Sequence, residues 1–396
     1  MNKRIFTIAD CFSFIKNGAN IKQDKEKRGY PITRIETTSN NVFNRDKVGY
    51  AGIEDITPYQ DYVLEDGDLL MSHINSLPYL GRVVYYDRRQ DEVIIHGMNL
   101  LRLKAIKTRL RPKYATFLFS SIRFKNKILT IAKKSVNQAS FSINDLKKVC
   151  IELPTVEEQD NIVYKLVGIQ KIIQLRNTQL MKLDALVKCR FVELFGNPVV
   201  NPKNWPKQDL ASYIDFMTSG SRGWSKFFSN NGKYFITIKN VKGGKVSTAS
   251  VQYVNPPNNA EAIRTKLKEG DLLISITADL GRTGVVSKEI ADYGAYINQH
   301  LTCVRLKPET LHPLYTAYFL ETEAGKLQFS SKNQNAVKAG LNFDSIKSLQ
   351  ILVPPRPKQE TFVTFVSCID KLRFDVQAAL EKAQTLFDSL MQEYFG

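Results

Sequence analysis

Apolar residues recur at alternating steps of four and three along two long stretches of the chain. This heptad pattern is typical of a helix that buries one seam against a partner helix. The pattern predicts two long helices that form an antiparallel coiled coil; the alternative is that each seam packs on its own globular domain. The seam residues are Ile162, Leu166, Ile169, Ile173, Leu180, Leu183, Val187, Phe362, Val366, Ile369, Val376, Leu380, Phe387 and Leu390.

The ends of the first long helix carry start and stop signals. Thr155 and Glu158 have the spacing of a capping box, in which each side chain bonds to the backbone N–H of the other. Gly196, followed by Pro198, suits the end of a helix. In the second copy Pro357 suits a first helical position. Each helix would have about 40 residues and a length of about 60 Å at 1.5 Å per residue.

The two stretches belong to a repeat that covers the whole chain. Residues 353–396 align on residues 153–196 without a gap, and eleven of the 44 positions are identical. Glu65–Ser72 matches Lys268–Ser275, and an Arg-Leu-Lys segment at Arg102 matches one at Arg305. A protein with two similar halves suits a partner that also has two similar halves. The predicted boundaries are 1–152, 153–197, 198–352 and 353–396.

The two globular halves mix short β-rich stretches with helical ones. Acidic and glycine-containing turns precede the apolar segments Leu69–Ser72 and Leu272–Ile276, which read as strands. Helical segments near Tyr114–Ile131 and Tyr315–Phe329 each follow a proline. Each half is therefore predicted to be an α+β domain with curved sheets.

Charge is the next clue, because the net charge is +17. Residues 93–144 contain no acidic residue and eleven basic ones. Such a run favours a surface that faces phosphate groups. The alternatives are a solvated basic face or a surface that meets an acidic partner.

Other classes of protein fit the sequence less well. No run of about 18 apolar residues is present, and the start of the chain lacks the apolar region of a secretory signal. The five cysteines are far apart, without a CxxC pair. We therefore expect reduced thiols rather than disulfides or a zinc site, and a cytoplasmic protein.

The search for catalytic residues finds no complete site. The phosphate loop GxxxxGK[ST] is absent, and the four histidines lack metal-ligand spacing. Asp68 and Asp271 could suggest a nuclease, but a two-metal nuclease needs acids that converge, and the sequence identifies no second acid that would converge with either, so turns explain them better. Asn255–Asn258 resembles the Asn-Pro-Pro-aromatic signature of adenine N6-methyltransferases, yet Asn258 is not aromatic. No glycine motif for S-adenosylmethionine accompanies it. We read this segment as a turn and predict a chain without catalysis.

The layout resembles the specificity (S) subunit of type I restriction–modification systems. The resemblance rests on Leu153-Pro154 with Glu157-Glu158-Gln159, the long helix, and Phe195-Gly196-Asn197-Pro198. The second copy repeats it with Val353-Pro354-Pro355, Gln359 and Tyr394-Phe395-Gly396 but lacks the Glu-Glu-Gln start. It covers the whole chain, and its specificity lies in the order and repetition of the motifs.

The resemblance implies a non-catalytic, DNA-binding subunit. It also implies two pseudo-symmetric target-recognition domains, each of which would read half of a split DNA sequence. The paired helices would set the unread gap between the two halves. The implied partners are double-stranded DNA, two methyltransferase (M) subunits and restriction–translocation (R) subunits. S-adenosylmethionine would belong to the methyltransferase, ATP and Mg to the restriction partner, and no cofactor to this chain. No membrane contact is expected.

DNA-contacting residues do not transfer from the family, because its recognition loops vary. We instead selected polar residues in predicted loops of both halves, since Asn, Gln and Arg can pair with base edges and Lys mostly contacts phosphate. The candidates are Asn20, Lys22, Arg28, Ser72, His73, Asn75, Arg82, Arg102, Lys104, Lys133, Lys134, Asn137, Gln138, Arg222, Trp224, Lys226, Ser275, Thr277, Asp279, Arg282, Lys332, Asn333, Gln334, Asn335 and Lys338.

Two other functions stay open at this point. One is an enzyme, either the detached recognition part of a fused methyltransferase–restriction protein or an unrecognised methyltransferase. The missing methyltransferase motifs argue against it. The other is a scaffold whose helix pair joins two protein-binding domains. Binding to duplex DNA that survives high salt would exclude the scaffold, because purely electrostatic binding fades with salt.

Overall fold

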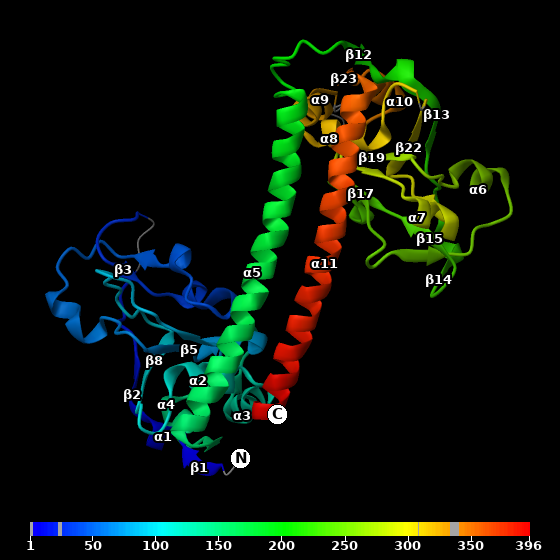
Figure 1. The fold of residues 1–396 in the computed structure, drawn as a ribbon. Helices are drawn as coiled ribbons and strands as arrows, with labels where there is room; N and C mark the ends of the chain where they lie inside the picture. Colours follow the sequence, from blue (N-terminus) through cyan, green and yellow to red (C-terminus); the bar gives the residue numbers. More distant parts are fainter. Residues whose placement is uncertain (1–2, 23–25, 308, 333–339) are drawn as a thin grey trace. The chain divides into compact units, whose positions relative to one another are not determined.

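The chain folds into two compact units, each with an α+β domain and a part of both long helices (Figure 1). The first unit combines Met1–Asn177 with Gln377–Gly396, and the second is Thr178–Val376. The structure is a computed structural model. It describes residues 3–22, 26–307, 309–332 and 340–396.

The two long helices are α5 (Val156–Phe195) and α11 (Arg356–Phe395), of 40 residues each, as predicted. The capping box before α5 is confirmed. The backbone N–H of Thr155 donates to the carboxylate of Glu158 at 3.0 Å, and the N–H of Glu158 donates to the hydroxyl of Thr155 at 3.2 Å. Gly196 follows α5 with φ of 82°. This left-handed conformation favours glycine.

Side-chain contacts give the direction of the helices within the second unit. Asp184 forms an ion pair with Arg373 at 2.6 Å. Further along α5, the ring of Phe191 lies 5.3 Å from that of Phe362 on α11, centroid to centroid. Residue numbers rise on one helix as they fall on the other, so the segments run antiparallel. The predicted antiparallel pairing is confirmed there.

The seam residues are buried or half-buried, and at the helix ends they also enter the domain cores. In the first unit, Ile162 and Leu166 of α5 share one apolar cluster with Phe395 of α11 and with Tyr114 of the domain. In the second unit, Leu183 and its neighbours belong to the equivalent cluster. The two alternatives for the seam are therefore both realised, because the helix ends contact each other and the domain.

The α5 seam changes its spacing after Val187. A further step of three would lead to Arg190, whereas the structure buries Phe191 and Phe195. These steps of four follow the 3.6-residue period of a straight helix. The two rings pack into the core of the second domain, and Arg190 instead lies over the ring of Phe365 at 5.6 Å.

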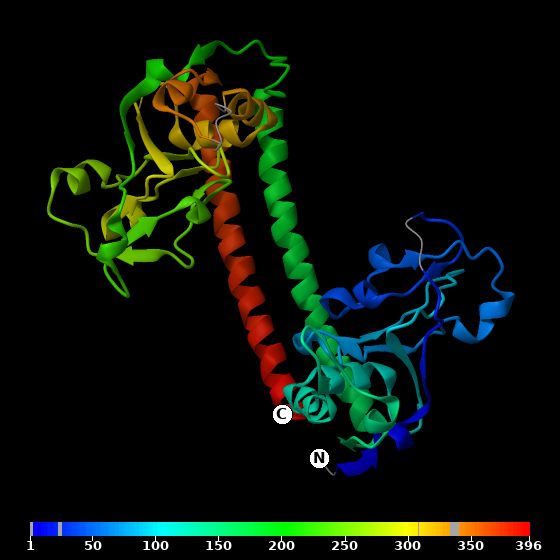
Figure 2. The same ribbon diagram turned by 180° about the vertical axis from the view of Figure 1, so that it is seen from behind.

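The first domain is built around a four-stranded antiparallel sheet of order β2-β8-β5-β7. Residues of helices α2 and α3 pack in one apolar cluster with strands of this sheet and with residues of both long helices; Figure 2 shows this unit from behind. Its strands and helices are β1 (Arg4–Thr7), α1 (Ile8–Cys11), β2 (Phe12–Asn17), β3 (Pro31–Ile32), β4 (Gly49–Tyr50), β5 (Leu69–Ser72), β6 (Ile74–Asn75), β7 (Val83–Tyr85), β8 (Leu100–Ala105), α2 (Pro112–Ser120), α3 (Ile122–Ile131), β9 (Lys133–Lys134), β10 (Ala139–Ser140), α4 (Ile143–Lys147) and β11 (Cys150–Leu153).

The second domain has a six-stranded sheet of order β13-β22-β19-β20-β17-β16 and a four-stranded one of order β14-β18-β15-β21. Its strands and helices are β12 (Lys207–Asp209), β13 (Ile214–Ser219), β14 (Phe228–Ser229), β15 (Lys233–Ile236), β16 (Val241–Lys242), β17 (Gly244–Val246), β18 (Gln252–Val254), α6 (Ala260–Thr265), β19 (Leu272–Ser275), β20 (Thr283–Val285), α7 (Lys288–Tyr293), β21 (Ala295–Ile297), β22 (Leu301–Leu306), α8 (Pro313–Glu321), α9 (Glu323–Lys332), α10 (Phe343–Lys347) and β23 (Gln350–Leu352). The first four strands of the larger sheet repeat the order of the first domain.

Strand pairing corrects one part of the sequence repeat. Leu103 pairs with Leu69, and Val304 pairs with Leu272, which is the counterpart of Leu69. Leu103 and Val304 therefore occupy the same place. The alignment of the two Arg-Leu-Lys segments in the sequence repeat is therefore wrong by two residues. Three identical residue types suggested that alignment, and the strand pairing that corrects it cannot be seen in the sequence.

A buried aspartate begins the central strand in both domains. Asp68 accepts a hydrogen bond from the N–H of Glu65 at 2.7 Å, as Asp271 does from Lys268 at 2.7 Å. The predicted turns are therefore present. Arg102 pairs with Asp68 at 2.7 Å. Burial nevertheless raises the pKa of Asp68.

The second domain neutralises its aspartate from a different position. Arg305 makes two hydrogen bonds to Asp271, at 2.8 and 2.7 Å. By strand register, Arg305 occupies the place of Lys104, and the place of Arg102 is taken by Cys303. A buried carboxylate needs a cationic partner. The two domains supply this partner from equivalent strands, β8 and β22, but from positions that differ by two residues.

A buried glutamine connects each long helix to its domain. In the first unit, the side-chain oxygen of Gln159 accepts a hydrogen bond from the N–H of Arg111 at 2.9 Å. Its amide nitrogen donates to the carbonyls of Arg109 at 2.8 Å and Pro154 at 3.1 Å. One side chain thereby satisfies three backbone groups and fixes the start of α5 against the loop before α2.

Gln359 makes the same three contacts in the second unit. Its oxygen accepts from the N–H of His312 at 2.8 Å, and its nitrogen donates to the carbonyls of Thr310 at 3.0 Å and Pro354 at 2.8 Å. Both glutamines are fully buried. The Gln159–Gln359 identity in the sequence repeat thus reflects one duplicated contact. Within the part of the chain that the structure describes, no helix is long and apolar enough to span a membrane.

Candidate nucleic-acid interface

The predicted DNA-contacting loops of the first domain converge at one edge of its central sheet. Ser72, the last residue of β5, pairs with Leu100, the first residue of β8. Asn17, the last residue of β2, pairs with Leu101. The loops after Asn17 and Ser72 and the loop before Leu100 therefore leave from neighbouring points.

A small sheet extends this edge. Ile74 pairs with Ser140, which pairs with Lys133 on the next strand. Lys133 and Lys134 are exposed. Two cationic side chains thus lie beside the three loops, where they can meet phosphate groups.

The second domain repeats the convergence. Ser219 at the end of β13 pairs with Thr302, and Ser275 at the end of β19 pairs with Leu301 at the start of β22. Thr277 forms a bridge with Gly340, in the position of the Ile74–Ser140 pair. The predicted loops of both halves are therefore brought to equivalent places.

The backbone joins two of these loops tightly in the first domain. The N–H of Ala19 donates to the carbonyl of His96 at 2.8 Å, and the N–H of Met98 donates back to Ala19 at 3.0 Å. A Cβ on Gly18 would lie 2.0 Å from the carbonyl oxygen of Gly97. Only glycine permits this approach.

The same contacts recur in the second domain. The N–H of Ser221 donates to the carbonyl of Ile297 at 2.8 Å, and the N–H of Gln299 donates back to Ser221 at 3.0 Å. A Cβ on Gly220 would lie 2.1 Å from the carbonyl oxygen of Asn298. We call this joined pair of loops the loop frame: residues 18–20 with 96–99 in the first domain, and 220–222 with 297–300 in the second.

Four side chains around the second loop frame form a polar chain. Nε of Arg222 donates to the side-chain oxygen of Gln299 at 2.7 Å. The imidazole of His300 lies 3.4 Å from the amide nitrogen of Gln299 and 2.8 Å from the hydroxyl of Thr277. The sequence predicted Arg222 and Thr277 but missed Gln299 and His300. Their position directly before the Arg-containing strand was the signal that could have found them.

Most other candidates lie where solvent reaches them. The exposed ones are Asn20, Lys22, Arg28, Lys133, Lys134, Asn137, Gln138, Arg222, Lys226 and Asp279. The half-buried ones are Asn75, Arg82, Lys104, Thr277, Arg282 and Lys332. Asn333, Gln334, Asn335 and Lys338 lie outside the described residues.

Ser72 and Ser275 have a structural role instead. The hydroxyl of Ser72 donates to the carbonyl of Tyr79 at 2.6 Å and accepts from the N–H of Arg82 at 3.2 Å. Ser275 makes the same pair of contacts in its own loop. Both are fully buried, so the prediction that they contact DNA is wrong. Their hydroxyls close the loop that follows the central strand.

His73 and Trp224 are also buried. Burial lowers the pKa of His73. Its ring packs against Phe141 with centroids 6.4 Å apart. The indole N–H of Trp224 donates to Glu261 at 2.9 Å, and its ring stacks on Phe235. Both side chains belong to the interior, which corrects their assignment to the DNA surface.

Arg102 is the third correction. Its side chain is 4% exposed and paired with Asp68, so it is not available to a phosphate group. Lys104 is partly exposed but pairs with Glu65 at 2.5 Å, and this hydrogen bond lowers the pKa of Glu65. A phosphate group would have to compete with Glu65 for Lys104.

The acid-free stretch of residues 93–144 is not one phosphate-facing surface. Acids from other parts of the chain pair with its arginines, as Asp160 does with Arg111 at 2.8 Å and Glu152 with Arg123 at 2.5 Å. Lysines of the stretch outside these pairs, such as Lys133, stay exposed. Arg111 and Arg123 therefore do not belong to the predicted phosphate-facing surface, because acids from outside the stretch lie beside them in the folded chain.

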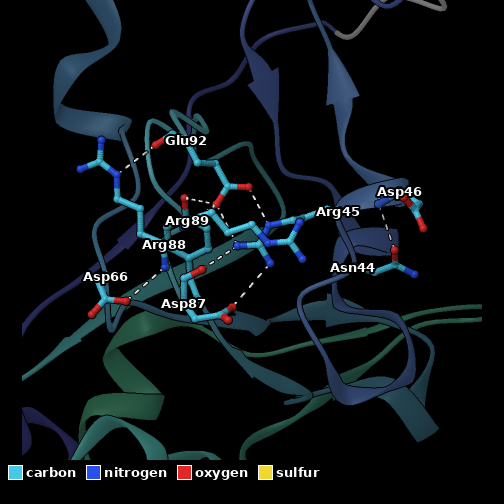
Figure 3. A network of polar contacts seen from close by, with 9 residues as sticks. Asn44, Arg45, Asp46, Asp66, Asp87, Arg88, Arg89 and Glu92 are labelled. Carbon is cyan, nitrogen blue, oxygen red and sulfur yellow. Dashed lines mark hydrogen bonds and ion pairs between the residues drawn. The ribbon is translucent and has the colours of Figure 1, made fainter. Parts of the chain in front are cut away.

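A further arginine network lies at the other edge of the first sheet (Figure 3). Arg45 donates to Glu92 at 2.6 Å and to the carbonyl of Asp87 at 2.6 Å, and the bond to Glu92 lowers the pKa of that carboxyl. The N–H of Arg88 donates to Asp66 at 3.1 Å. Asp66 precedes β5 and Asp87 follows β7, so this network is remote from the loop frame. The network stabilises the turn that follows β7.

Comparison with known proteins identifies a family for both halves. The family described as type I restriction modification DNA specificity domain matches residues 2–185 and 215–383. The type I restriction enzyme MjaX specificity subunit of Methanocaldococcus jannaschii is 30% identical over 383 residues, which cover 92% of this chain and 86% of that protein. The EcoKI specificity subunit of Escherichia coli is 27% identical over 38% of this chain and 32% of its own length.

A solved structure has the same fold. The S subunit of a type I restriction–modification system from M. genitalium superposes with a TM-score of 0.60 at 16% identity. The superposition covers 100% of this chain and 96% of that one.

Proposed function

The chain belongs to the type I restriction–modification DNA specificity family, whose recognition domain it carries twice, and we propose that each copy reads one half of a split duplex sequence. The observation that carries this proposal is the duplicated loop frame. Each domain brings three loops to one sheet edge, and polar side chains from these loops reach solvent there. Loops on a rigid sheet edge are a usual place for recognition residues.

The long helices would set the distance between the two half-sites. Each has 40 residues. At that number of residues a helix is about 60 Å long, which exceeds one turn of duplex DNA at about 34 Å. The duplicated glutamine contact supports this role, since the buried side chains of Gln159 and Gln359 each fix a domain to its helix by three hydrogen bonds. A domain fixed in this way transmits the helix geometry to the DNA.

Catalysis would come from other subunits, two methyltransferase subunits and the restriction–translocation subunits. S-adenosylmethionine would belong to the former, and ATP with Mg to the latter. The helices offer surface for such partners, because Leu175, Leu372, Phe374 and Leu386 are each at least half exposed. Exposed apolar side chains of this size are typical of interaction sites.

The test is to express the chain with its methyltransferase partner in a host that lacks adenine methylation and to map N6-methyladenine in the genome. We expect one methylated motif, split by a fixed gap, that disappears when this chain is omitted. A matched control expresses the Gln159→Leu Gln359→Leu variant, which should reduce methylation without changing the bases of the motif. A stable complex that methylates nothing would contradict the proposal.

A further inference from the structure

The two domains share the loop frame but present different side chains on it. We propose that four corresponding positions on or beside each loop frame determine which bases that domain reads. This inference rests on the proposed function and names the side chains that would select the bases. The positions are Arg222, Thr277, Gln299 and His300 in the second domain, and Asn20, Ile74, Met98 and Asn99 in the first.

The equivalence of the positions is fixed by backbone contacts rather than by sequence identity. Met98 and Gln299 each donate their N–H to the residue that follows the frame glycine, at 3.0 Å in both domains. Ile74 and Thr277 are equivalent because each stands two residues after the serine that ends the central strand. Side chains at the first three positions therefore start from corresponding places on the two frames. Asn99 and His300 each come next in the chain, but of the two only Asn99 has a left-handed backbone, with φ of 70°.

The frame does not need the polar chain of the second domain. The first domain keeps the same hydrogen bonds and the same glycine approach with asparagine at position 20 and methionine at position 98. The hydrogen bond between Arg222 and Gln299 is therefore not required to hold the loops together. It instead restrains a solvent-exposed guanidinium, which lowers the entropy cost of contacting a ligand.

The two sets of side chains suit different bases. The hydrogen bond to Gln299 uses Nε of Arg222. Arginine reads guanine O6 and N7 with two parallel N–H groups. Asn20 and Asn99 match adenine N6 and N7, and the apolar Met98 and Ile74 suit the methyl group of thymine. The half-site read by the second domain should contain guanine, and the one read by the first domain should consist mainly of A·T pairs at the contacted positions.

Neighbouring lysines complete the first site without adding specificity. Lys133 is two strands away from Ile74 in the same small sheet, and Lys134 is next to it. Both are exposed. They can meet phosphate groups, which position a protein on DNA but do not identify a base. Base preference is thus left to the four frame positions.

The experiment exchanges the side chains of one frame for those of the other. A variant with Arg222→Asn, Thr277→Ile, Gln299→Met and His300→Asn is expressed with the methyltransferase partner, and N6-methyladenine is mapped as for the unchanged chain. We expect the guanine-containing half-site to lose its guanine preference by about 10- to 100-fold, the effect of one lost bidentate contact. The other half-site and the gap should stay unchanged and serve as an internal reference.

Two further variants keep the outcome decisive. Arg222→Lys alone keeps the charge and removes the paired N–H groups, so it should relax guanine preference even if the fourfold variant does not fold. Lys288→Asn removes an exposed charge of the same domain, at the start of α7, and should leave the motif unchanged.

The possible results separate the two proposals. An unchanged motif in the Arg222→Lys and fourfold variants, both methylating normally, would overturn the inference while the proposed function stands. An absence of any split motif with the unchanged chain would overturn the proposed function instead. A wild-type motif whose half-sites both lack guanine would also contradict the base assignment.

Discussion

The two domains are built on one plan but bury different residues at equivalent places. The first domain buries His73, His96 and Arg102 in or near its loop frame. By strand register, the second domain has Ile276, Ile297 and Cys303 at these positions, the first half-buried and the other two buried. At these three places the first domain thus has two histidines and an arginine, and the second has two isoleucines and a cysteine. This difference makes the first domain more sensitive to the loss of its arginine, and it gives that domain a buried histidine, His96, whose counterpart Ile297 does not titrate.

The largest expected effect is the loss of Arg102. Asp68 has a side chain that is 1% exposed and pairs with Arg102. Arg102→Ala leaves this carboxylate buried without its partner, which should cost about 3–5 kcal/mol of stability in the first domain. Arg305→Ala should cost less in the second domain, because the Arg305 side chain is 24% exposed and water can replace it. Hydrogen exchange resolved by domain measures both, with exposed Lys107→Ala as the control. Equal losses in the two domains would break the comparison.

The second effect should be equal in both halves. Gln159 and Gln359 are buried, and each bonds to three backbone groups. Gln159→Leu and Gln359→Leu each leave these groups without a partner, at a cost of about 3 kcal/mol. Denaturant unfolding followed by fluorescence measures the loss. Gln170 of α5 is exposed. Gln170→Leu should therefore change stability by less than about 0.5 kcal/mol. A loss in only one of the two variants would show that the duplicated contact is not equivalent.

Acid should affect the first domain through His96. Burial lowers its pKa from 6.5 to about 4. The folded domain therefore binds fewer protons than the unfolded one between these values. Its stability is full above pH about 6.5 and falls as the pH drops toward 4, by on the order of 2 kcal/mol at about pH 4.5. His96→Ile, the residue of the second domain, should flatten this dependence.

Thermal unfolding at several pH values is the measurement for the histidine variant. His312 of the second unit also has a pKa lowered to about 4 by burial, so part of the dependence on pH should remain. The same slope in His96→Ile as in the unchanged chain would show that His96 contributes nothing.

The smallest effect concerns the exposed lysines beside the first loop frame. Lys133→Ala with Lys134→Ala should weaken binding to all duplex sequences alike. The slope of log affinity against log salt should fall by about 1.8, since each lost phosphate contact contributes about 0.9. Binding titrations at several salt concentrations measure it. A changed base preference would mean that these lysines read bases.

The sequence predicted those structural elements that are determined by local residue patterns. Heptads, a capping box and a repeat located both long helices, and acidic turns located the central strands. It did not predict which loop residues turn inward, because the hydroxyls of Ser72 and Ser275 bond to backbone groups that only the folded loop brings near. It also assumed that Arg102 and Arg305 were equivalent, although strand pairing shifts them by two positions. Gln299 was missed because its role depends on a loop 77 residues away in sequence, at Arg222.

The central claim is that two equivalent domains read DNA at a separation set by the paired helices. The most direct measurement removes one heptad from each helix, residues 171–177 and 380–386, and maps the methylated motif. Seven residues correspond to about 10 Å, so the gap should shorten by up to about three base pairs while both half-sites keep their bases. Insertion of one heptad in each helix should lengthen the gap by a similar amount. An unchanged gap with intact half-sites would contradict the claim.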